Sequence, residues 1–255
     1  MTLLVFDSGI GGLGVVRAVR ELAPEEPLIY LGDTGFFPYG QKPDEILLPH
    51  IVALMGRAVA ALAPRAVVVA CNTASTIALP ALRASLGVPV VGCVPPIKPA
   101  ARASHSRTIG VLATAATVRR PYLSGLIAEF AQGCRVLSLG TPALAELAER
   151  KFRGERVAVG EIIAPLFAQP GGGEIDAIAL GCTHYTFLLP EFMAERPDIS
   201  WHDPAMPVAR QTLRVAAHVP ATRSAHSGTA FFTGAPVNPA LLAPFGFRRA
   251  ETCQW

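Results

Sequence analysis

The chain has 255 residues, which is enough for one large domain or two small ones, each with a substantial core. Apolar residues make up 51% of the sequence and charged residues 16%, a composition that excludes a disordered chain. The formal net charge is only +3, and the basic residues are scattered, so we expect no nucleic-acid partner.

The N-terminal segment carries no basic stretch before its first apolar residues, and those end too soon for a signal-peptide core. We identify no apolar run near the ~20 residues of a membrane helix. A cytoplasmic protein without a membrane partner is therefore expected. The odd set of five cysteines contains no CxxC pair, which favours thiols over a disulfide framework or a zinc ribbon.

Short apolar runs alternate along the chain with longer stretches in which apolar residues recur at helical spacing. The predicted strands are, in chain order, 3–6, 28–31, 66–70, 89–93, 108–113, 135–139 and 177–181. Helices are expected between them, for example over 14–22, 44–62 and 74–86. Continuous apolar strands are typical of parallel sheets that helices cover on both faces.

Two proline-containing stretches, 93–101 and 203–209, indicate crossings between two lobes. We therefore expect an α/β fold of two similar open parallel-sheet lobes with helices on both faces. The first lobe would comprise residues 1–93 plus a C-terminal helix and tail over 207–255, and the second residues 94–206. Because ligands of open α/β sheets bind past the carboxyl ends of strands, the active site is expected in the cleft between the lobes. Four residues that follow predicted strands would line it: Asp7, Cys71, Thr114 and Cys182.

Two of the apolar runs end alike, with Cys71 in VVVACNTAS and Cys182 in AIALGCTHY, and a helix is expected after each cysteine. A thiol becomes a base or a nucleophile at neutral pH where a helix N-terminus or a proton-accepting neighbour favours the thiolate. A lone cysteine is more often a small buried hydrophobe, but two in matching contexts favour a catalytic pair. The other three cysteines lack this context and are expected to be structural.

The segment DSGIGGLG joins the first predicted strand to the first helix, but its glycines match neither the dinucleotide pattern nor the P-loop pattern. Asp7 at its start would repel a phosphate; it either holds an ammonium group or caps the following helix. The segment GDTGFFPYG, after the second strand, is typical of a loop that lines a site. Its Tyr39 is either a residue of that site or a core aromatic.

Other chemistries fit the cysteines less well. His184 stands two places after Cys182, but no further ligands are evident nearby, so no metal is expected. A phosphatase of the C-x₅-R kind is excluded, because Ile77 and Leu188 stand where its arginine is needed. A pyridoxal enzyme needs a Schiff-base lysine. The three lysines of the chain do not end predicted strands, so no cofactor is expected: Lys42, Lys98 and Lys151.

Five segments, FDSGIGGLGV, GDTGFFPYG, ACNTAS, GVLATAATV and LGCTHY, occur in the order and spacing of one family. The chain resembles the glutamate racemases, within the wider aspartate/glutamate racemase superfamily, from near residue 5 to near residue 205. The resemblance implies cofactor-independent racemisation by two bases. Cys71 would serve D-glutamate with help from Asp7, and Cys182 would serve L-glutamate with help from His184 and Glu149.

The same resemblance implies a homodimer that supplies D-glutamate for peptidoglycan. Inversion at a planar carbon needs a proton donor on each face, which agrees with two cysteines. Neutral hydrogen-bond donors would stabilise the charge that develops on the substrate carboxylate. Two loop residues, Tyr39 and Gly40, would close the pocket. The residues expected to bind the substrate are Asp7, Ser8, Tyr39, Gly40, Asn72, Thr73, Thr114, Thr117, Thr183 and His184.

Two other functions stay open on the sequence. One is a racemase or isomerase of the same fold that acts on aspartate or another small acid, because the cysteine pair defines the reaction better than the substrate. The other is a two-lobed binding protein that closes on a ligand without turnover.

Overall fold

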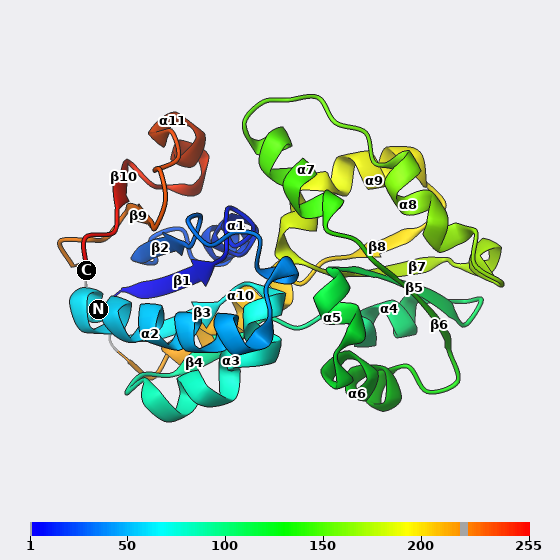
Figure 1. Cartoon of the computed structure of the whole chain (residues 1–255), viewed down its shortest axis with the longest axis horizontal. Coiled ribbons are helices and arrows are strands. Elements are labelled where there is room, and N and C mark those ends of the chain that lie inside the picture. The colour runs from blue at the N-terminus through cyan, green and yellow to red at the C-terminus, as the bar shows by residue number, and fades with distance from the viewer. Residues whose placement is uncertain (1, 220–223) are drawn as a thin grey trace. The chain divides into compact units, whose positions relative to one another are not determined.

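The computed structural model describes residues 2–219 and 224–255, and the chain divides into two compact units (Figure 1). The first unit comprises residues 1–93 and 205–255, and the second comprises residues 94–204. Residues 1 and 220–223, which fall within the first expected lobe, lie outside the described part of the chain.

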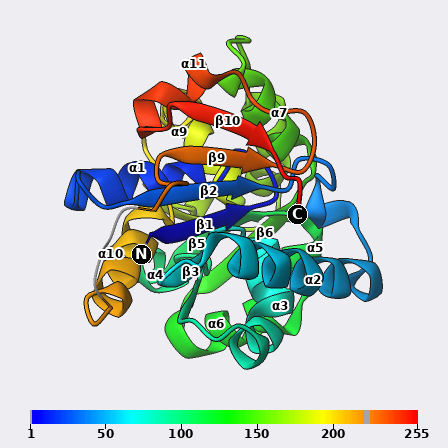
Figure 2. The same cartoon turned by 90° about the vertical axis from the view of Figure 1, so that its left-hand side faces the viewer.

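The sheet of the first unit is parallel throughout, with the strand order β10-β9-β2-β1-β3-β4 (Figure 2). The strands, in chain order, are β1 (Leu3–Asp7), β2 (Leu28–Gly32), β3 (Ala66–Val69), β4 (Val90–Gly92), β9 (Thr229–Phe232) and β10 (Arg249–Thr252). Every residue of β1, β2 and β3 is buried. Burial on both faces explains why these strands are continuous apolar runs in the sequence.

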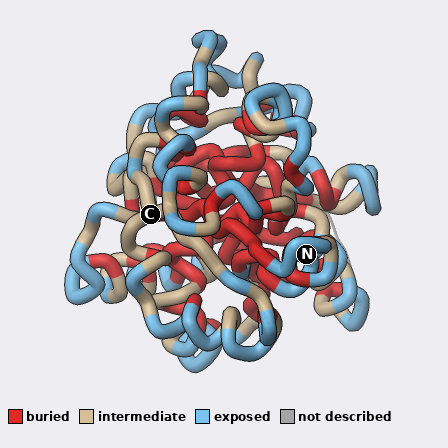
Figure 3. The backbone as a smooth tube through the Cα atoms, turned by 90° about the vertical axis from the view of Figure 1, so that its right-hand side faces the viewer, coloured by how far each residue is buried: buried red, intermediate tan, exposed pale blue. Residues whose placement is uncertain are grey.

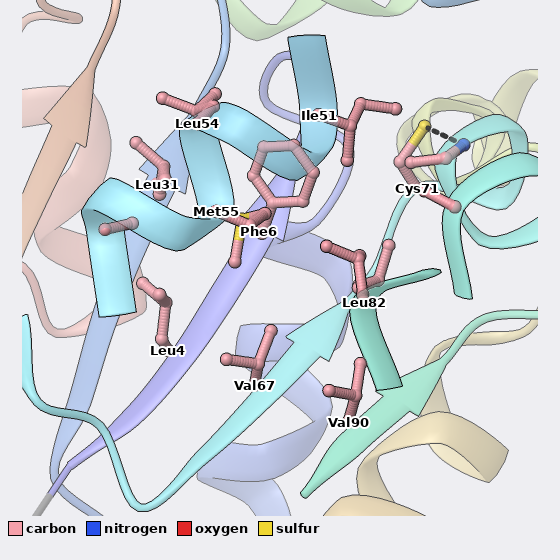
Figure 4. Packing of buried hydrophobic residues seen from close by; sticks show 14 of the residues in the cluster. Leu4, Phe6, Leu31, Ile51, Leu54, Met55, Val67, Cys71, Leu82 and Val90 are labelled. Carbon is pink, nitrogen blue, oxygen red and sulfur yellow. Dashed lines mark hydrogen bonds between the residues drawn. The ribbon is translucent and has the colours of Figure 1, made fainter. Parts of the chain in front are cut away.

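Helices cover both faces of this sheet. They are α1 (Leu13–Leu22), α2 (Asp44–Leu62), α3 (Asn72–Ser85), α10 (Ala205–Ala216) and α11 (Pro239–Leu242), with the 3-10 turns η1 (Tyr39–Gln41) and η4 (Ala243–Phe245). Side chains of α2 and α3 pack on one face against Leu4, Phe6 and Val67 (Figure 4). Successive strand residues point to opposite faces, so Leu3 and Val5 face the other side. Helix α10 contacts both α1 and the strands β3 and β4.

Helix α2 is 19 residues long and, by length and composition, would suit a membrane span, which the sequence analysis did not recognise. In this fold one side of the helix is buried in the hydrophobic core of the first unit, through residues such as Leu47, Ile51, Leu54 and Met55. Core helices of soluble proteins pass the same test of length and composition, and 33% of the apolar window of α2 is buried.

The second unit has its own parallel sheet, with the strand order β6-β5-β7-β8. Its strands are β5 (Thr108–Ala113), β6 (Arg135–Gly140), β7 (Ala177–Gly181) and β8 (Ser200–His202). Its helical segments are α4 (Ile97–Ala103), α5 (Ala115–Arg119), α6 (Pro121–Phe130), α7 (Ala143–Phe152), α8 (Gly160–Phe167), η2 (Gly172–Glu174), η3 (Thr183–Leu188) and α9 (Leu189–Glu195). Side chains of α4, α6, β5 and β7 form its hydrophobic core, including Ile97, Ile109, Val111 and Leu123.

The expected α/β fold with two parallel, helix-covered sheets is confirmed. Every residue of β5, β7 and β9 is buried as well, whereas exposed residues follow the outer turns (Figure 3). The sequence analysis missed three short strands, β8, β9 and β10. Strand β10 has no buried residue, so its sequence carries no continuous apolar run. A C-terminal helix and tail were expected, but after α10 the chain returns to the sheet as β9 and β10.

Candidate active site

Cys71 lies two residues past the end of β3 and is the N-cap of α3. Its Sγ accepts a hydrogen bond from the backbone N–H of Ala74 at 3.5 Å, which Figure 4 marks with a dashed line. The same sulfur lies 3.7 Å from Ser8 Oγ, and Cys71 is only 6% exposed. The backbone N–H and the positive end of a 14-residue helix both favour negative charge on this sulfur.

Asp7 is the last residue of β1 and is fully buried. Its Oδ1 accepts a hydrogen bond from the N–H of Gly9 at 2.9 Å. Since the N-cap position of α1 is Gly12, Asp7 orders the turn and does not cap the helix. A Cβ on Gly12 would lie 2.9 Å from the Asp7 Cβ, so only glycine lets this turn approach the carboxylate so closely.

Asn72 and Thr73 begin helix α3 and are 2% and 3% exposed. Among the described residues, neither Oδ1 nor Nδ2 of Asn72 has a hydrogen-bond partner. Leaving a buried amide unsatisfied costs about 1–3 kcal/mol, so such a group calls for an explanation. A polar ligand at the start of α3 would supply the missing partners.

Tyr39 and Gly40 lie in η1, after β2. Tyr39 is buried, and its hydroxyl donates a hydrogen bond to Asp33 Oδ2 at 2.5 Å. Burial, followed by the charge and hydrogen bond of Asp33 and the charges of Cys71 and Asp7, raises the pKa of Tyr39 far above its ordinary value. Its hydroxyl therefore stays a proton donor to Asp33. Gly40 is half-buried.

In the second unit, Cys182 directly follows β7 and is 7% exposed. The helical segment expected after it is the 3-10 helix η3, which begins at Thr183 and is followed by α9. Tyr185 in this segment is fully buried, and its hydroxyl donates to the backbone oxygen of Thr141 at 3.0 Å. Burial raises the pKa of Tyr185, and the charge of Cys182 raises it further. Tyr185 therefore anchors the segment as a neutral phenol.

His184 and Glu149 meet in the interior of the second unit, with 2% and 5% exposure. His184 Nε2 lies 3.2 Å from Glu149 Oε1. The other oxygen of Glu149 accepts from Arg153 Nη2, also at 3.2 Å. A carboxylate beside an imidazole fixes its tautomer and orientation, so Glu149 directs the histidine that follows Cys182.

Thr114 follows the last residue of β5 and caps α5. Its Oγ1 accepts from the N–H of Thr117 at 3.2 Å and lies 3.0 Å from the Thr117 hydroxyl. In the sheet, Ala113 at the end of β5 pairs with Gly181 at the end of β7. Thr114 and Cys182 therefore leave neighbouring strands at the same edge.

The predicted residues thus form two groups, one in each unit. At the carboxyl edge of the first sheet lie Asp7, Ser8, Tyr39, Gly40, Cys71, Asn72 and Thr73. At the carboxyl edge of the second sheet lie Thr114, Thr117, Glu149, Cys182, Thr183 and His184. All five cysteines of the chain are thiols. No group of three or more His, Cys, Asp or Glu side chains suited to a metal ion occurs among the described residues.

Sequence analysis missed Asp33, His50 and Thr233, which meet beside Tyr39. Asp33 Oδ2 lies 2.6 Å from His50 Nε2, and its Oδ1 accepts from the Thr233 hydroxyl at 2.5 Å. Asp33 follows β2 directly, just as Cys182 follows β7, so its place after a strand was the available signal. Thr233 lies about 200 positions away along the chain, and no local pattern indicates that contact.

The family model described as Asp/Glu/Hydantoin racemase matches residues 13–205. A glutamate racemase of Granulibacter bethesdensis is 50% identical over 215 residues, which cover 84% of this chain and 78% of that protein. A glutamate racemase of Sphingopyxis alaskensis is 43% identical over 258 residues, covering 98% of this chain and 96% of that protein.

Among solved structures, the crystal structure of Escherichia coli glutamate racemase in complex with L-glutamate and the activator UDP-MurNAc-ala is similar over 98% of this chain and 97% of that chain. The TM-score is 0.90 and the sequence identity 39%. The match thus extends over both units. The chain belongs to the Asp/Glu/hydantoin racemase family, whose enzymes are isomerases.

Proposed function

We propose that this protein is a glutamate racemase that interconverts L- and D-glutamate by two-base proton transfer without a cofactor. The observation that carries the proposal is the pair of buried thiols, Cys71 and Cys182, each past the carboxyl end of a parallel strand. The relatives named glutamate racemase, similar along almost the whole chain, support glutamate as the substrate.

In the proposed reaction, the Cys71 thiolate removes the α-proton of D-glutamate, and the C–H electron pair passes into the carboxylate. The Cys182 thiol then donates its proton to the opposite face of the flattened carbon, which yields L-glutamate and a Cys182 thiolate. The reverse direction exchanges the two roles. Proton and electron balance is complete within these two steps, so no oxidant or cofactor is needed.

The first group of residues supports the role of Cys71. The N–H of Ala74 and the start of α3 favour the thiolate that must remove a proton. Asp7, buried at the end of the neighbouring strand β1, is proposed to assist at this thiol. The carboxamide of Asn72, which no described residue satisfies, is proposed to bind a polar group of the substrate.

The second group supports the role of Cys182. His184, oriented by Glu149, is proposed to assist Cys182 in removing the α-proton of L-glutamate. The α-proton is weakly acidic, so preorganised neutral donors must hold the charge that develops on the carboxylate. We assign this part to Thr73, Thr114 and Thr183, which are buried at the strand ends. Ser8, Thr117, Tyr39 and Gly40 are proposed to complete the substrate pocket.

The cellular role that we propose is the supply of D-glutamate for peptidoglycan, by a cytoplasmic homodimer. Complementation tests this role directly. A bacterial strain that requires D-glutamate should grow without it when it expresses this chain, and should still require it when the chain carries Cys71→Ser.

The activity itself is tested by incubating the purified protein separately with L-glutamate, D-glutamate and L-aspartate, followed by chiral chromatography. We expect both glutamate enantiomers to reach a mixture near 1:1 and aspartate to stay unchanged. If the protein racemised aspartate and not glutamate, aspartate would be its substrate. Binding of glutamate without inversion would indicate a binding protein.

A further inference from the structure

The carboxylate of Asp33 is a meeting point of three separate segments of the first unit. Asp33 directly follows β2 and is 1% exposed. Its Oδ2 accepts from the Tyr39 hydroxyl at 2.5 Å and lies 2.6 Å from His50 Nε2, while its Oδ1 accepts from the Thr233 hydroxyl at 2.5 Å. A carboxylate only accepts hydrogen bonds, and short charge-assisted bonds of this kind are about twice as strong as neutral ones.

The C-terminal part of the unit is bonded to the same loop through the backbone. The Thr233 hydroxyl, which donates to Asp33, also accepts from the N–H of Gly35 at 3.0 Å. The N–H of Gly234 donates in turn to Thr34 Oγ1 at 3.2 Å. A Cβ on Gly234 would lie 3.0 Å from Thr34 Oγ1, so glycine allows this close approach. Asp33 and its neighbours are thus fixed to the segment that follows β9.

Aromatic contacts connect Asp33 and its partners to the buried cluster that contains Cys71. The rings of His50 and Phe36 are stacked with centroids 4.0 Å apart. Tyr39 packs edge-on against Phe36 and lies 6.4 Å from Phe6, and its side chain belongs to the same buried cluster as Cys71. One end of the Tyr39 ring is therefore held by Asp33, and the ring packs in the same buried cluster as the proposed catalytic thiol.

The Tyr39 hydroxyl is not suited to move a proton itself. Burial and the nearby charge of Asp33 raise the pKa of Tyr39, so the phenol keeps its proton at neutral pH. That proton is donated to Asp33. Tyr39 therefore has a positional role, and its position depends on the hydrogen bond to Asp33.

We propose that Asp33 is a positioning residue, which holds Tyr39 and the loop 34–41 in place beside Cys71 and so sets the affinity for the substrate without taking part in proton transfer. This inference rests on the proposed racemase function. A loop that contacts the ground state and the transition state alike changes KM and leaves kcat largely unaltered. Loss of the Asp33 contacts is therefore expected to appear in KM.

The test measures kcat and KM for both glutamate enantiomers in four variants. Asp33→Ala removes the carboxylate, Thr233→Val removes one of its donors, and Thr233→Ser keeps that hydroxyl. Asp198→Asn, which changes a carboxylate on the surface of the second unit, is the matched control. We expect KM to rise about tenfold in Asp33→Ala and about threefold in Thr233→Val, with kcat within about threefold. Thr233→Ser and Asp198→Asn should match the unaltered protein.

A second measurement needs no substrate. Chymotrypsin cleaves after aromatic residues, and the loop offers Phe36 and Tyr39 as sites. Mass spectrometry of limited digests should show faster cleavage after these residues in Asp33→Ala and Thr233→Val than in Thr233→Ser. If the protein failed to racemise glutamate, the proposed function would fall, whereas the digests alone would still show whether Asp33 holds the loop.

Three results would overturn the inference. The first is an unchanged KM in both Asp33→Ala and Thr233→Val. The second is a fall in kcat with KM unchanged, which would place Asp33 in the chemistry. The third is equal cleavage of the loop in the Val and Ser variants of Thr233. If Asp33→Ala does not fold, the Thr233→Val and Thr233→Ser pair still decides between these outcomes, because Ser keeps the hydroxyl that donates to Asp33 and accepts from Gly35, whereas Val lacks it.

Discussion

His184 Nε2 lies 3.2 Å from Glu149 Oε1, and both side chains are buried in the second unit. The contact joins the segment after β7 to helix α7, which also donates to the backbone of η3 through Lys151 Nζ at 2.8 Å from the Phe187 oxygen. Since the acceptor at one ring nitrogen decides which tautomer the imidazole adopts, Glu149 controls the form in which His184 meets its neighbours.

The first prediction concerns this contact. Glu149→Gln replaces the carboxylate by an amide that pairs less strongly with the imidazole, so kcat should fall about tenfold. The loss should be larger in the exchange of the α-hydrogen of L-glutamate, the proton that we assign to Cys182, than in that of D-glutamate, and it is read by proton NMR in heavy water. Arg153→Ala is the control, because the exposed Arg153 pairs with the same carboxylate and should change the rate less than about twofold. A symmetrical loss in Glu149→Gln would contradict the assignment.

The second prediction concerns the unsatisfied amide of Asn72. Asn72→Leu keeps the approximate shape and removes two buried polar atoms without partners, so the free energy of unfolding should stay level or rise by about 1 kcal/mol. At the same time kcat/KM should fall about a hundredfold, since we propose that the amide binds the substrate. Urea denaturation and initial rates measure the two effects.

Ser75→Ala is the matched control on the same helix. Ser75 Oγ donates to the Val69 oxygen and accepts from the Cys93 N–H, each at 2.9 Å. Its loss should lower the free energy of unfolding by about 1–2 kcal/mol, with kcat/KM within about threefold. The amide would be structural if Asn72→Leu lowered stability as much as Ser75→Ala and kept full activity.

The third prediction concerns pH and Asp176, in the second unit. Burial raises its pKa, but hydrogen bonds from Ser104, Ser106 and His105 outweigh burial and bring the pKa below its ordinary value of 3.8. Two of them are backbone N–H groups that donate to Asp176 Oδ2 at 2.7 Å. Because the folded-state pKa is depressed, the stabilisation is present above the unfolded-state pKa and is lost as pH falls through the folded-state pKa.

Asp176→Asn keeps the shape of the side chain and removes the charge. At pH 7 the variant should be less stable than the unaltered protein by about 1 kcal/mol. The difference in Tm, measured by differential scanning calorimetry from pH 7 downwards, should close below about pH 4. A difference in Tm that stays constant down to pH 3 would show that the charge of Asp176 does not stabilise the fold.

The strands of the fold could be predicted where burial on both faces of the sheet requires an unbroken run of apolar residues. Strands such as 66–69 are buried on both faces and read as unbroken apolar runs, and α2 is found with the expected bounds, 44–62. Strands at the sheet edges carry less signal. β10 is largely exposed, and β8 has only three residues, so neither requires an apolar run.

The site, like the fold, could be predicted only where the local sequence indicates it. Residues at or just past strand ends, such as Asp7, Cys71 and Cys182, could be predicted to lie at the carboxyl edges of their sheets, because parallel strands place such positions at one edge. Glu149 was indicated only by resemblance, and its contact with His184 joins two segments that local spacing does not relate. The Asp33–Thr233 contact was missed for the same reason.

The central claim is that each cysteine serves one enantiomer. Its most direct test is exchange of the α-hydrogen for deuterium in heavy water, followed by proton NMR for each enantiomer with Cys71→Ser, Cys182→Ser and, as control, Cys134→Ser. Neither of the first two variants should racemise glutamate. Cys182→Ser should retain part of the exchange of D-glutamate alone, Cys71→Ser part of that of L-glutamate alone, and Cys134→Ser should behave as the unaltered protein. Normal racemisation in both of the first two variants, or exchange of both enantiomers by a single remaining thiol, would contradict the two-base account.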